Sequence, residues 1–178
     1  YLGGYTFMKI GIVAFPSKKI QDLANTYRKR YDSHYALITP YITLKDTFEV
    51  DESQLKEIIP KLQQIASRFA PLQIHASRIS SFYPTTNVIY FRIEPTEQLT
   101  SLHSTIQTEL NVGKLKHVFV PHITIARDLS DAEHDDIYGQ LRMTGVDEKD
   151  VIDRFHLLYQ LEDGSWTTYE IFKLNGAE

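Results

Sequence analysis

The chain of 178 residues contains no cysteine. Disulfides, thiolate zinc sites and cysteine nucleophiles are therefore excluded, and the composition fits a reducing compartment. No apolar run approaches the roughly 18 residues that a membrane span requires, and the N-terminus lacks the pattern of a signal peptide. We therefore expect a soluble, cytoplasmic protein with no membrane partner.

The sequence also lacks an excess of positive charge. Its formal net charge is −4 and its pI is about 6.0, which argues against a protein that coats nucleic acid by charge alone. The HExxH motif does not occur, and His117, His122 and Glu133 have no recognised metal-ligand spacing. We predict no metal and no cofactor, so any phosphate contact must come from a local cluster of side chains.

The residues that are present are those of a folded protein, since 42% are hydrophobic and 24% charged, enough for one sizeable core. The apolar periodicity predicts strand, helix, strand, helix, strand, and then nearly the same order again. The expected fold class is α+β. The expected strands cover 9–15, 37–44, 72–82, 87–94 and 118–126, followed by a C-terminal hairpin over 155–161 and 166–174.

Helix starts are marked by residues that can cap free backbone amides. We expect helices after Ser17, over 55–69, after Thr96 and after Ser130, where Glu133 completes a capping box. The basic cluster at 28–30 closes the first helix, where the helix dipole favours cations. It forms either a solvated helix end or a rim that attracts phosphate.

A short segment occurs twice: Pro40-Tyr41-Ile42-Thr43-Leu44 is echoed 81 residues later (Pro40 to Pro121) by Pro121-His122-Ile123-Thr124-Ile125. Because the echo falls at the same place in two matching element orders, we interpret it as an internal duplication. No Gly- or Ser-rich linker separates the halves. We expect one domain over 8–178 with two lobes, roughly 8–86 and 87–178, and we expect residues 1–7 to be a leader, a tag or a mis-set start.

The chemistry follows from strand geometry. Side chains alternate along a strand, so His122 and Thr124 point to one side while the intervening isoleucines point to the other. If the duplication is also a spatial pseudo-twofold, Tyr41 and Thr43 project into the same groove from the opposing lobe. Threonine hydroxyls can donate hydrogen bonds to phosphate, and a histidine can move a proton near neutral pH. Such a groove suits hydrolysis of a cyclic phosphodiester, in which one group accepts a proton from water and another protonates the leaving oxygen.

The paired segments resemble the two HxTx motifs of the two-histidine (2H) phosphoesterase superfamily, typified by LigT-like RNA ligases and cyclic phosphodiesterases. The stretches FPSKKIQDLANTYRKRYD, NVIYFRIEPTEQL, FVPHITIARDLSDAEH and DRFHLLYQLEDGSWTTYE resemble the YjcG branch of Firmicute proteins, from Met8 essentially to the C-terminus. This resemblance implies a bilobal fold in which two pseudo-twofold-related sheets line a central cleft, with helices on the outside. It also implies a metal-independent phosphoesterase whose ligand is a nucleotide or RNA-end phosphate.

The resemblance further implies a role for each motif residue. His122 would be the base, the residue at position 41 would protonate the leaving group, and Thr43 and Thr124 would hold the phosphate. Tyr41, however, stands where the family has its first histidine. A tyrosine hydroxyl, with an ordinary pKa near 10, can donate a hydrogen bond or a proton but is a poor base. We therefore expect impaired or absent turnover, and the alternative is a non-catalytic module that binds nucleotide or RNA phosphate.

Other residues near the motifs leave open alternatives. Lys45 and Arg127 follow the two motifs and either approach a phosphate or form solvated strand ends. Three further histidines are predicted to be structural: His103, His134 and His156. Three aromatic residues are candidate stacking platforms for a nucleobase: Phe82, Tyr83 and Tyr90.

Overall fold

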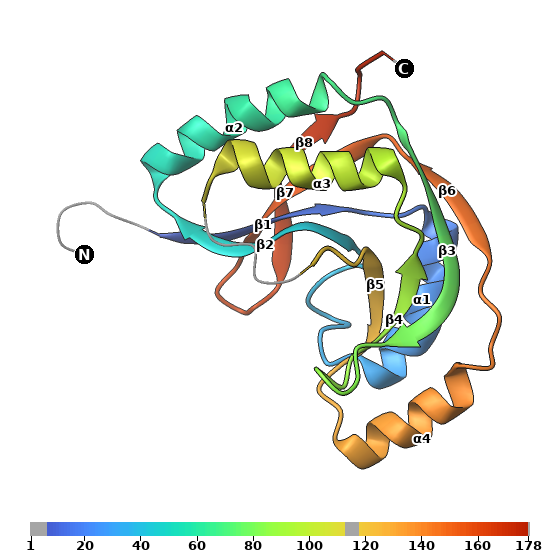
Figure 1. Cartoon of the computed structure of the whole chain (residues 1–178). Helices are drawn as coiled ribbons and strands as arrows, with labels where there is room; N and C mark the ends of the chain where they lie inside the picture. The colour runs from blue at the N-terminus through green and yellow to red at the C-terminus, as the bar shows by residue number, and fades with distance from the viewer. Residues whose placement is uncertain (1–6, 113–117, 178) are drawn as a thin grey trace.

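Figure 1 shows the computed structural model of the chain, which describes residues 7–112 and 118–177. These residues form two four-stranded antiparallel sheets. The first sheet has the order β2 (Ile42–Val50), β1 (Met8–Ala14), β7 (Arg154–Gln160) and β8 (Trp166–Lys173). The second has the order β5 (His122–Ala126), β4 (Ile89–Ile93), β3 (Leu72–Ser81) and β6 (Glu148–Ile152). The expected α+β class is confirmed, while residues 1–6 of the expected leader lie outside the described residues.

Four helices cover the outer faces of these sheets in the described part of the chain: α1 (Lys18–Tyr31), α2 (Glu52–Ala66), α3 (Glu97–Leu110) and α4 (Asp131–Leu141). Helix α1 packs against β5, α4 against β3, and α3 lies beside α2 over β2 (Figure 1). None of these helices is both long and apolar enough to cross a membrane.

The predicted helix starts are largely confirmed. Thr96 accepts a hydrogen bond from the backbone N–H of Leu99, and Ser130 and Glu133 form the expected capping box. Ser17 precedes α1 but makes no side-chain cap; its backbone N–H instead donates to Asp150 at 2.5 Å. The second helix begins earlier than predicted because Asp51 caps it, so that Pro60 lies inside α2.

The two sheets match position by position, and each takes strands from both halves of the chain. The motif-bearing strands β2 and β5 are the edges, and β1 and β4 are their neighbours. The third strand of each sheet comes from the other half of the chain. Strand β7 of the C-terminal half joins the first sheet, and β3 of the N-terminal half joins the second. The spatial lobes therefore do not follow the division near residue 86, and backbone hydrogen bonds link the two halves.

A β-bulge occurs at the same position in both motifs. Along β1 and β2, Val13 pairs with Thr43 but Ile12 pairs with Lys45, so the register skips position 44. Along β4 and β5, Tyr90 pairs with Thr124 but Ile89 pairs with Ala126, so the register skips position 125. A bulge inserts an unpaired residue and redirects the side chains that follow it. Positions 44 and 125 are again 81 residues apart (125 − 44 = 81), which supports the duplication at the level of backbone geometry.

Three strand predictions differ from the structure. Residues 37–41 and 118–121 are not strand, so β5 begins at His122 and β2 begins at Ile42, one residue after Tyr41. The backbone N–H groups of Leu37 and Ile38 bond to the His34 carbonyl in turns instead of joining a ladder. Strand β6 was not predicted. Its sequence, EKDVI, has three charged residues because the strand lies at a half-exposed edge of the second sheet, so it lacks a clear apolar pattern.

Candidate active site

The two motifs lie on neighbouring edge strands, since β2 and β5 contact each other across the two sheets. Tyr41, Thr43, His122 and Thr124 are all partly exposed. The apolar residues between and after them are at most 1% exposed: Ile42, Leu44, Ile123 and Ile125. The alternation predicted from the sequence is therefore present in both strands, with the polar side chains directed away from the helix-covered core.

His122 is held in one orientation by its surroundings. Its Nδ1 lies 2.7 Å from the Val120 carbonyl oxygen, so Nδ1–H donates there and Nε2 is the free nitrogen of the neutral ring. The ring meets Phe82 and Tyr90 edge-on, with centroids 4.9 and 5.2 Å away. Burial lowers the pKa of His122; the bond to Val120 opposes this and the charge of Arg127 adds to it. The imidazole is therefore neutral at pH 7, as a base must be.

Arg127 connects the two motifs. Its Nη2 donates to the Tyr41 hydroxyl at 3.4 Å, and its Nη1 lies 2.8 Å from His34 Nδ1. Its Nε lies 2.8 Å from Asp32 Oδ1, close enough for an ion pair but without hydrogen-bond geometry. The side chain is only 16% exposed, so a solvated strand end is wrong for Arg127. The guanidinium instead orients the hydroxyl of the first motif from the end of the second.

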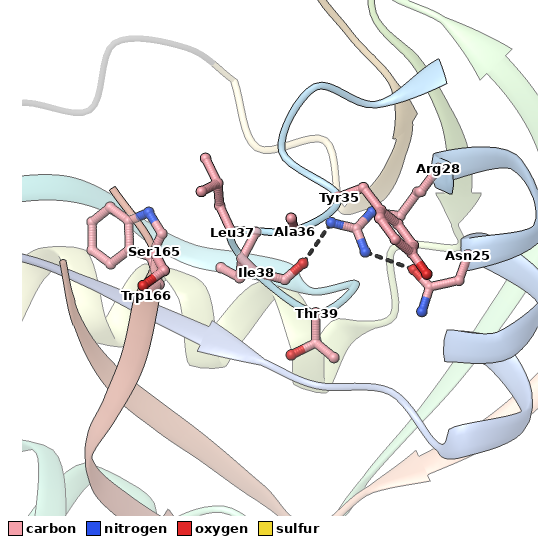
Figure 2. Close-up of a pocket in the computed structure, with 9 residues that line it drawn as sticks. All are labelled: Asn25, Arg28, Tyr35, Ala36, Leu37, Ile38, Thr39, Ser165 and Trp166. Atoms are coloured by element: carbon pink, nitrogen blue, oxygen red, sulfur yellow. Dashed lines mark hydrogen bonds between the residues drawn. The ribbon is translucent and has the colours of Figure 1, made fainter. Parts of the chain in front are cut away.

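Asp32, the partner of Arg127, also forms a buried ion pair with Arg28. Arg28 donates from Nε to Asp32 Oδ2 at 3.1 Å, and the two side chains are 1% and 0% exposed. Arg28 also donates to the Ile38 carbonyl at 2.6 Å and to Asn25 Oδ1 at 2.7 Å (Figure 2). The solvated helix end predicted for the basic cluster is therefore wrong for Arg28, although Lys29 and Arg30 are exposed.

Asp32 was not identified from the sequence. A signal for it exists, because Ile20, Ala24 and Arg28 are spaced by four residues on the buried face of α1, and Asp32 continues that spacing. A buried arginine on such a face requires a counter-ion. Asp32 thus serves two guanidinium groups, those of Arg28 and Arg127.

Lys45 is turned inward by the bulge at position 44. It is 6% exposed, and its Nζ donates to Gln107 Oε1 on α3 at 3.0 Å. Gln107 in turn donates from Nε2 to the Leu44 carbonyl at 2.6 Å, and burial lowers the pKa of Lys45. A solvated strand end is wrong for Lys45 also, and its position under α3 removes it from the group of side chains that face outward with Thr43.

Two surface hollows lie beside the buried ion pair. One, of about 390 Å³, lies between α1, the 35–39 segment and the start of β8, and Tyr35 and Trp166 contribute to its lining (Figure 2). The other, of about 410 Å³, is lined in part by Asp32 and Arg127. Neither includes the four motif side chains, so the shared phosphate groove remains a prediction.

The three histidines predicted to be structural, at positions 103, 134 and 156, each pack against an aromatic ring. His103 stacks on Phe119 at 3.8 Å, and His156 meets Phe15 edge-on at 4.7 Å. His134 stacks on Tyr83 and bonds through Nε2 to Ser81. Within residues 7–112 and 118–177, no three His, Asp or Glu side chains gather closely enough to hold a metal ion.

The three candidate base platforms have different surroundings. Tyr90 is 5% exposed and stacks under Phe82 at 4.2 Å, so it has no free face for a base. Tyr83 is 52% exposed but stacks on His134 of α4. Phe82 is partly exposed and touches His122, which makes it the one of the three that fits a base beside the motif.

The sequence profile of the 2′-5′ RNA ligase superfamily matches residues 15–164, a span that includes both motifs. The chain belongs to this superfamily. Its relatives include a protein of Geobacillus sp. (strain WCH70) named "Putative phosphoesterase GWCH70_0799", which is 56% identical over 96% of this chain and 99% of its own length. A similarly named Bacillus licheniformis protein is 50% identical over 94% of this chain and 99% of its own length.

Two solved structures share the fold of this chain. LigT of E. coli in complex with 3′-AMP matches with a TM-score of 0.72 at 15% identity, over 95% of this chain and 99% of LigT. The TT0787 protein of Thermus thermophilus matches with a TM-score of 0.74 at 18% identity, over 96% of this chain and 100% of TT0787. These structures confirm the LigT-like fold. The profile match and the relatives confirm the 2H phosphoesterase assignment, while the YjcG branch stays a prediction.

Proposed function

We propose that this 2H-type phosphoesterase hydrolyses a cyclic phosphodiester of a nucleotide or an RNA end without a metal ion, at a rate limited by Tyr41. The observation that carries the proposal is the matched pair of bulged edge strands. Each presents a hydroxyl two residues after a proton-transfer group, Thr43 after Tyr41 and Thr124 after His122. Two such hydroxyls can donate to the non-bridging oxygens of one phosphate.

The protons balance in a two-group mechanism. Nε2 of His122 accepts a proton from the attacking water while a new P–O bond forms, and the ring P–O bond breaks as Tyr41 gives its proton to the departing oxygen. The cycle closes when the imidazolium proton passes to solvent and Tyr41 regains one. Arg127, whose Nη2 donates to the Tyr41 hydroxyl, stabilises the negative charge that Tyr41 carries between these steps.

The nucleotide class of the ligand is supported by the LigT structures. They include complexes with 3′-AMP, ATP and NADP⁺, and one with phosphate itself. Every one of these ligands offers a phosphate group. We infer that the same class binds between Thr43 and Thr124 in this chain.

A second candidate function rests on Tyr41 itself. A tyrosine hydroxyl can donate a hydrogen bond to phosphate but is a weaker proton donor than an imidazolium near pH 7. The same site would then capture a nucleotide or RNA phosphate without turning it over. Hydrolysis in the parent protein separates the two candidates.

The test measures 3′-AMP binding and 2′,3′-cyclic AMP hydrolysis, both in EDTA, for the parent and for Thr43→Val and Thr124→Val. Each valine keeps the branched shape and removes one hydrogen bond to a charged oxygen, so we expect binding to weaken about 10- to 100-fold. The exposed Thr47→Val on the same strand is the matched control and should bind as the parent does.

The outcomes are separable. Slow hydrolysis that survives EDTA and falls in both valine variants supports the phosphoesterase. Threonine-dependent binding with no hydrolysis supports the binding module. Binding that ignores both valines, or hydrolysis that disappears in EDTA, contradicts the site.

The protonation of His122 gives a second check that does not need turnover. Because burial lowers its pKa below the ordinary 6.5, the neutral base persists as the pH falls through 6.5 and is lost only below that value. We expect the His122 ring protons, assigned with a His122→Ala variant, to titrate in NMR with a midpoint below pH 6.5. A midpoint at or above 6.5 would show that burial does not lower the pKa of His122.

A further inference from the structure

The outward face of the second sheet carries a line of three basic side chains that crosses three strands. In the register, Arg78 of β3 pairs with Arg92 of β4, and Arg92 pairs with His122 of β5. Residues directly opposite in an antiparallel pair share a face of the sheet. Because neighbouring strands are about 4.8 Å apart, Arg92 starts roughly 5 Å and Arg78 roughly 10 Å from His122 across the sheet.

The next row shows which face this is. Ile79, Phe91 and Ile123 pair in the same order and are at most 4% exposed. Phe91 meets Tyr27 of α1 edge-on at 6.0 Å, so this apolar row faces the helices. The basic row therefore lies on the opposite face. The side chains of His122 and Thr124, which are proposed to act on the phosphate, lie on the same face.

The two arginines have donors to spare. Arg78 is exposed, and its guanidinium makes no hydrogen bond or ion pair with any residue that the structure describes. Arg92 is 30% exposed, and only its Nε approaches a carboxylate, at 3.5 Å from Glu94. That carboxylate also accepts a hydrogen bond from Ser77. The two guanidiniums together carry ten N–H donors. Among the described residues these donors make one long contact, between Arg92 and Glu94.

We propose that this row binds the backbone of a single RNA strand, so that the preferred substrate is the 3′ end of an oligonucleotide and not a free nucleotide. This inference rests on the proposed function, because it places the terminal phosphate at His122. The phosphodiester before the terminal nucleotide binds Arg92 and the one before that binds Arg78. Guanidinium groups suit the purpose because their planar donors match phosphate oxygens in pairs.

The occupant follows from charge and spacing. A mononucleotide carries its only 3′ phosphate at the motifs and leaves both arginines unused. A strand that leaves the site across the sheet offers one negative charge to each arginine in turn. The contacts are to the backbone, so they select for length and not for base sequence.

The experiment compares two ligands that are not turned over, 3′-AMP and a 3′-phosphorylated tetra-adenylate, by titration in EDTA. We expect the parent to bind the tetranucleotide more tightly, and Arg92→Ala and Arg78→Ala each to weaken that binding about 5- to 10-fold while leaving 3′-AMP unchanged within about twofold. Each substitution should also reduce the slope of log affinity against log salt by about 0.7. Arg142→Ala, an exposed arginine after α4, is the matched control and should change neither ligand.

Failure of this inference differs from failure of the proposed function. If 3′-AMP binds in a Thr43- and Thr124-dependent way but the tetranucleotide gains nothing, the basic row is not a strand site and the phosphoesterase proposal stands. If 3′-AMP does not bind at all, the proposed function fails. Equal losses from Arg78→Ala and Arg142→Ala would show a general charge effect and overturn the inference.

Discussion

Replacing Tyr41 by histidine is expected to raise the rate of 2′,3′-cyclic AMP hydrolysis by about 10²–10⁴-fold, the usual contribution of a well-placed general acid or base. An imidazolium near its ordinary pKa of 6.5 protonates a leaving oxygen far more readily than a phenol does. The other three motif residues are present: Thr43, Thr124 and His122, whose Nε2 is free. The measurement is kcat in EDTA for the parent and the variant.

Two further variants isolate the cause of that gain. Tyr41→Phe keeps the ring and removes the hydroxyl, so any residual turnover of the parent should be lost. The double variant Tyr41→His with His122→Ala should lose the gain, because the base is missing. A Tyr41→His protein that binds 3′-AMP normally yet is no faster than the parent would show that position 41 does not protonate the leaving group.

Replacing Asp32 by alanine is expected to destabilise the protein by about 3–5 kcal/mol, because it leaves a buried charge without its partner. Arg28 is 1% exposed and would lose the one carboxylate that it contacts within residues 7–112 and 118–177, while Arg127 would lose the ion pair that holds it beside Tyr41. The backbone N–H of His34 would lose its acceptor as well. Urea unfolding measures the change, because the free energies of unfolding can be compared when both proteins show the same dependence on urea concentration.

Asp22→Ala is the control for Asp32→Ala. Asp22 also pairs with a cation four residues away in α1, but Lys18 and Asp22 are 86% and 63% exposed. Such surface pairs contribute at most about 0.5 kcal/mol. If the two variants lost the same stability, the buried pair would not support the loop that carries the first motif, and the positioning role given to Arg127 would need another origin.

The elements that could be predicted depend on short stretches of sequence. Thr96 and Ser130 marked helix starts because a cap and its amide lie within three residues of each other. The outward direction of His122 and Thr124 followed from strand alternation alone. The C-terminal hairpin was located by its Asp-Gly turn, and β7 and β8 lie within one residue of the expected bounds.

The elements that could not be predicted depend on partners distant in the chain. The basic cluster at 28–30 has the same local pattern whether or not Arg28 is buried. What decides it is its partner Asp32, which is shared with Arg127, 95 residues further along the chain (127 − 32 = 95). Lys45 looked like a strand end until the bulge at 44 turned it toward Gln107, 62 residues away. The row of Arg78, Arg92 and His122 exists only through the pairing of three strands.

By itself, the sequence determined that two similar strands each present a hydroxyl and a proton-transfer group, since side-chain direction and caps are set by neighbours in the chain. The tertiary structure decided the rest: the exchange of β3 and β7 between the sheets, the burial of Arg28 and Lys45, and the placement of Arg127 between the motifs. Periodicity encodes which face of a strand is apolar but not which strand will lie beside it, and pairing between distant strands depends on the whole core.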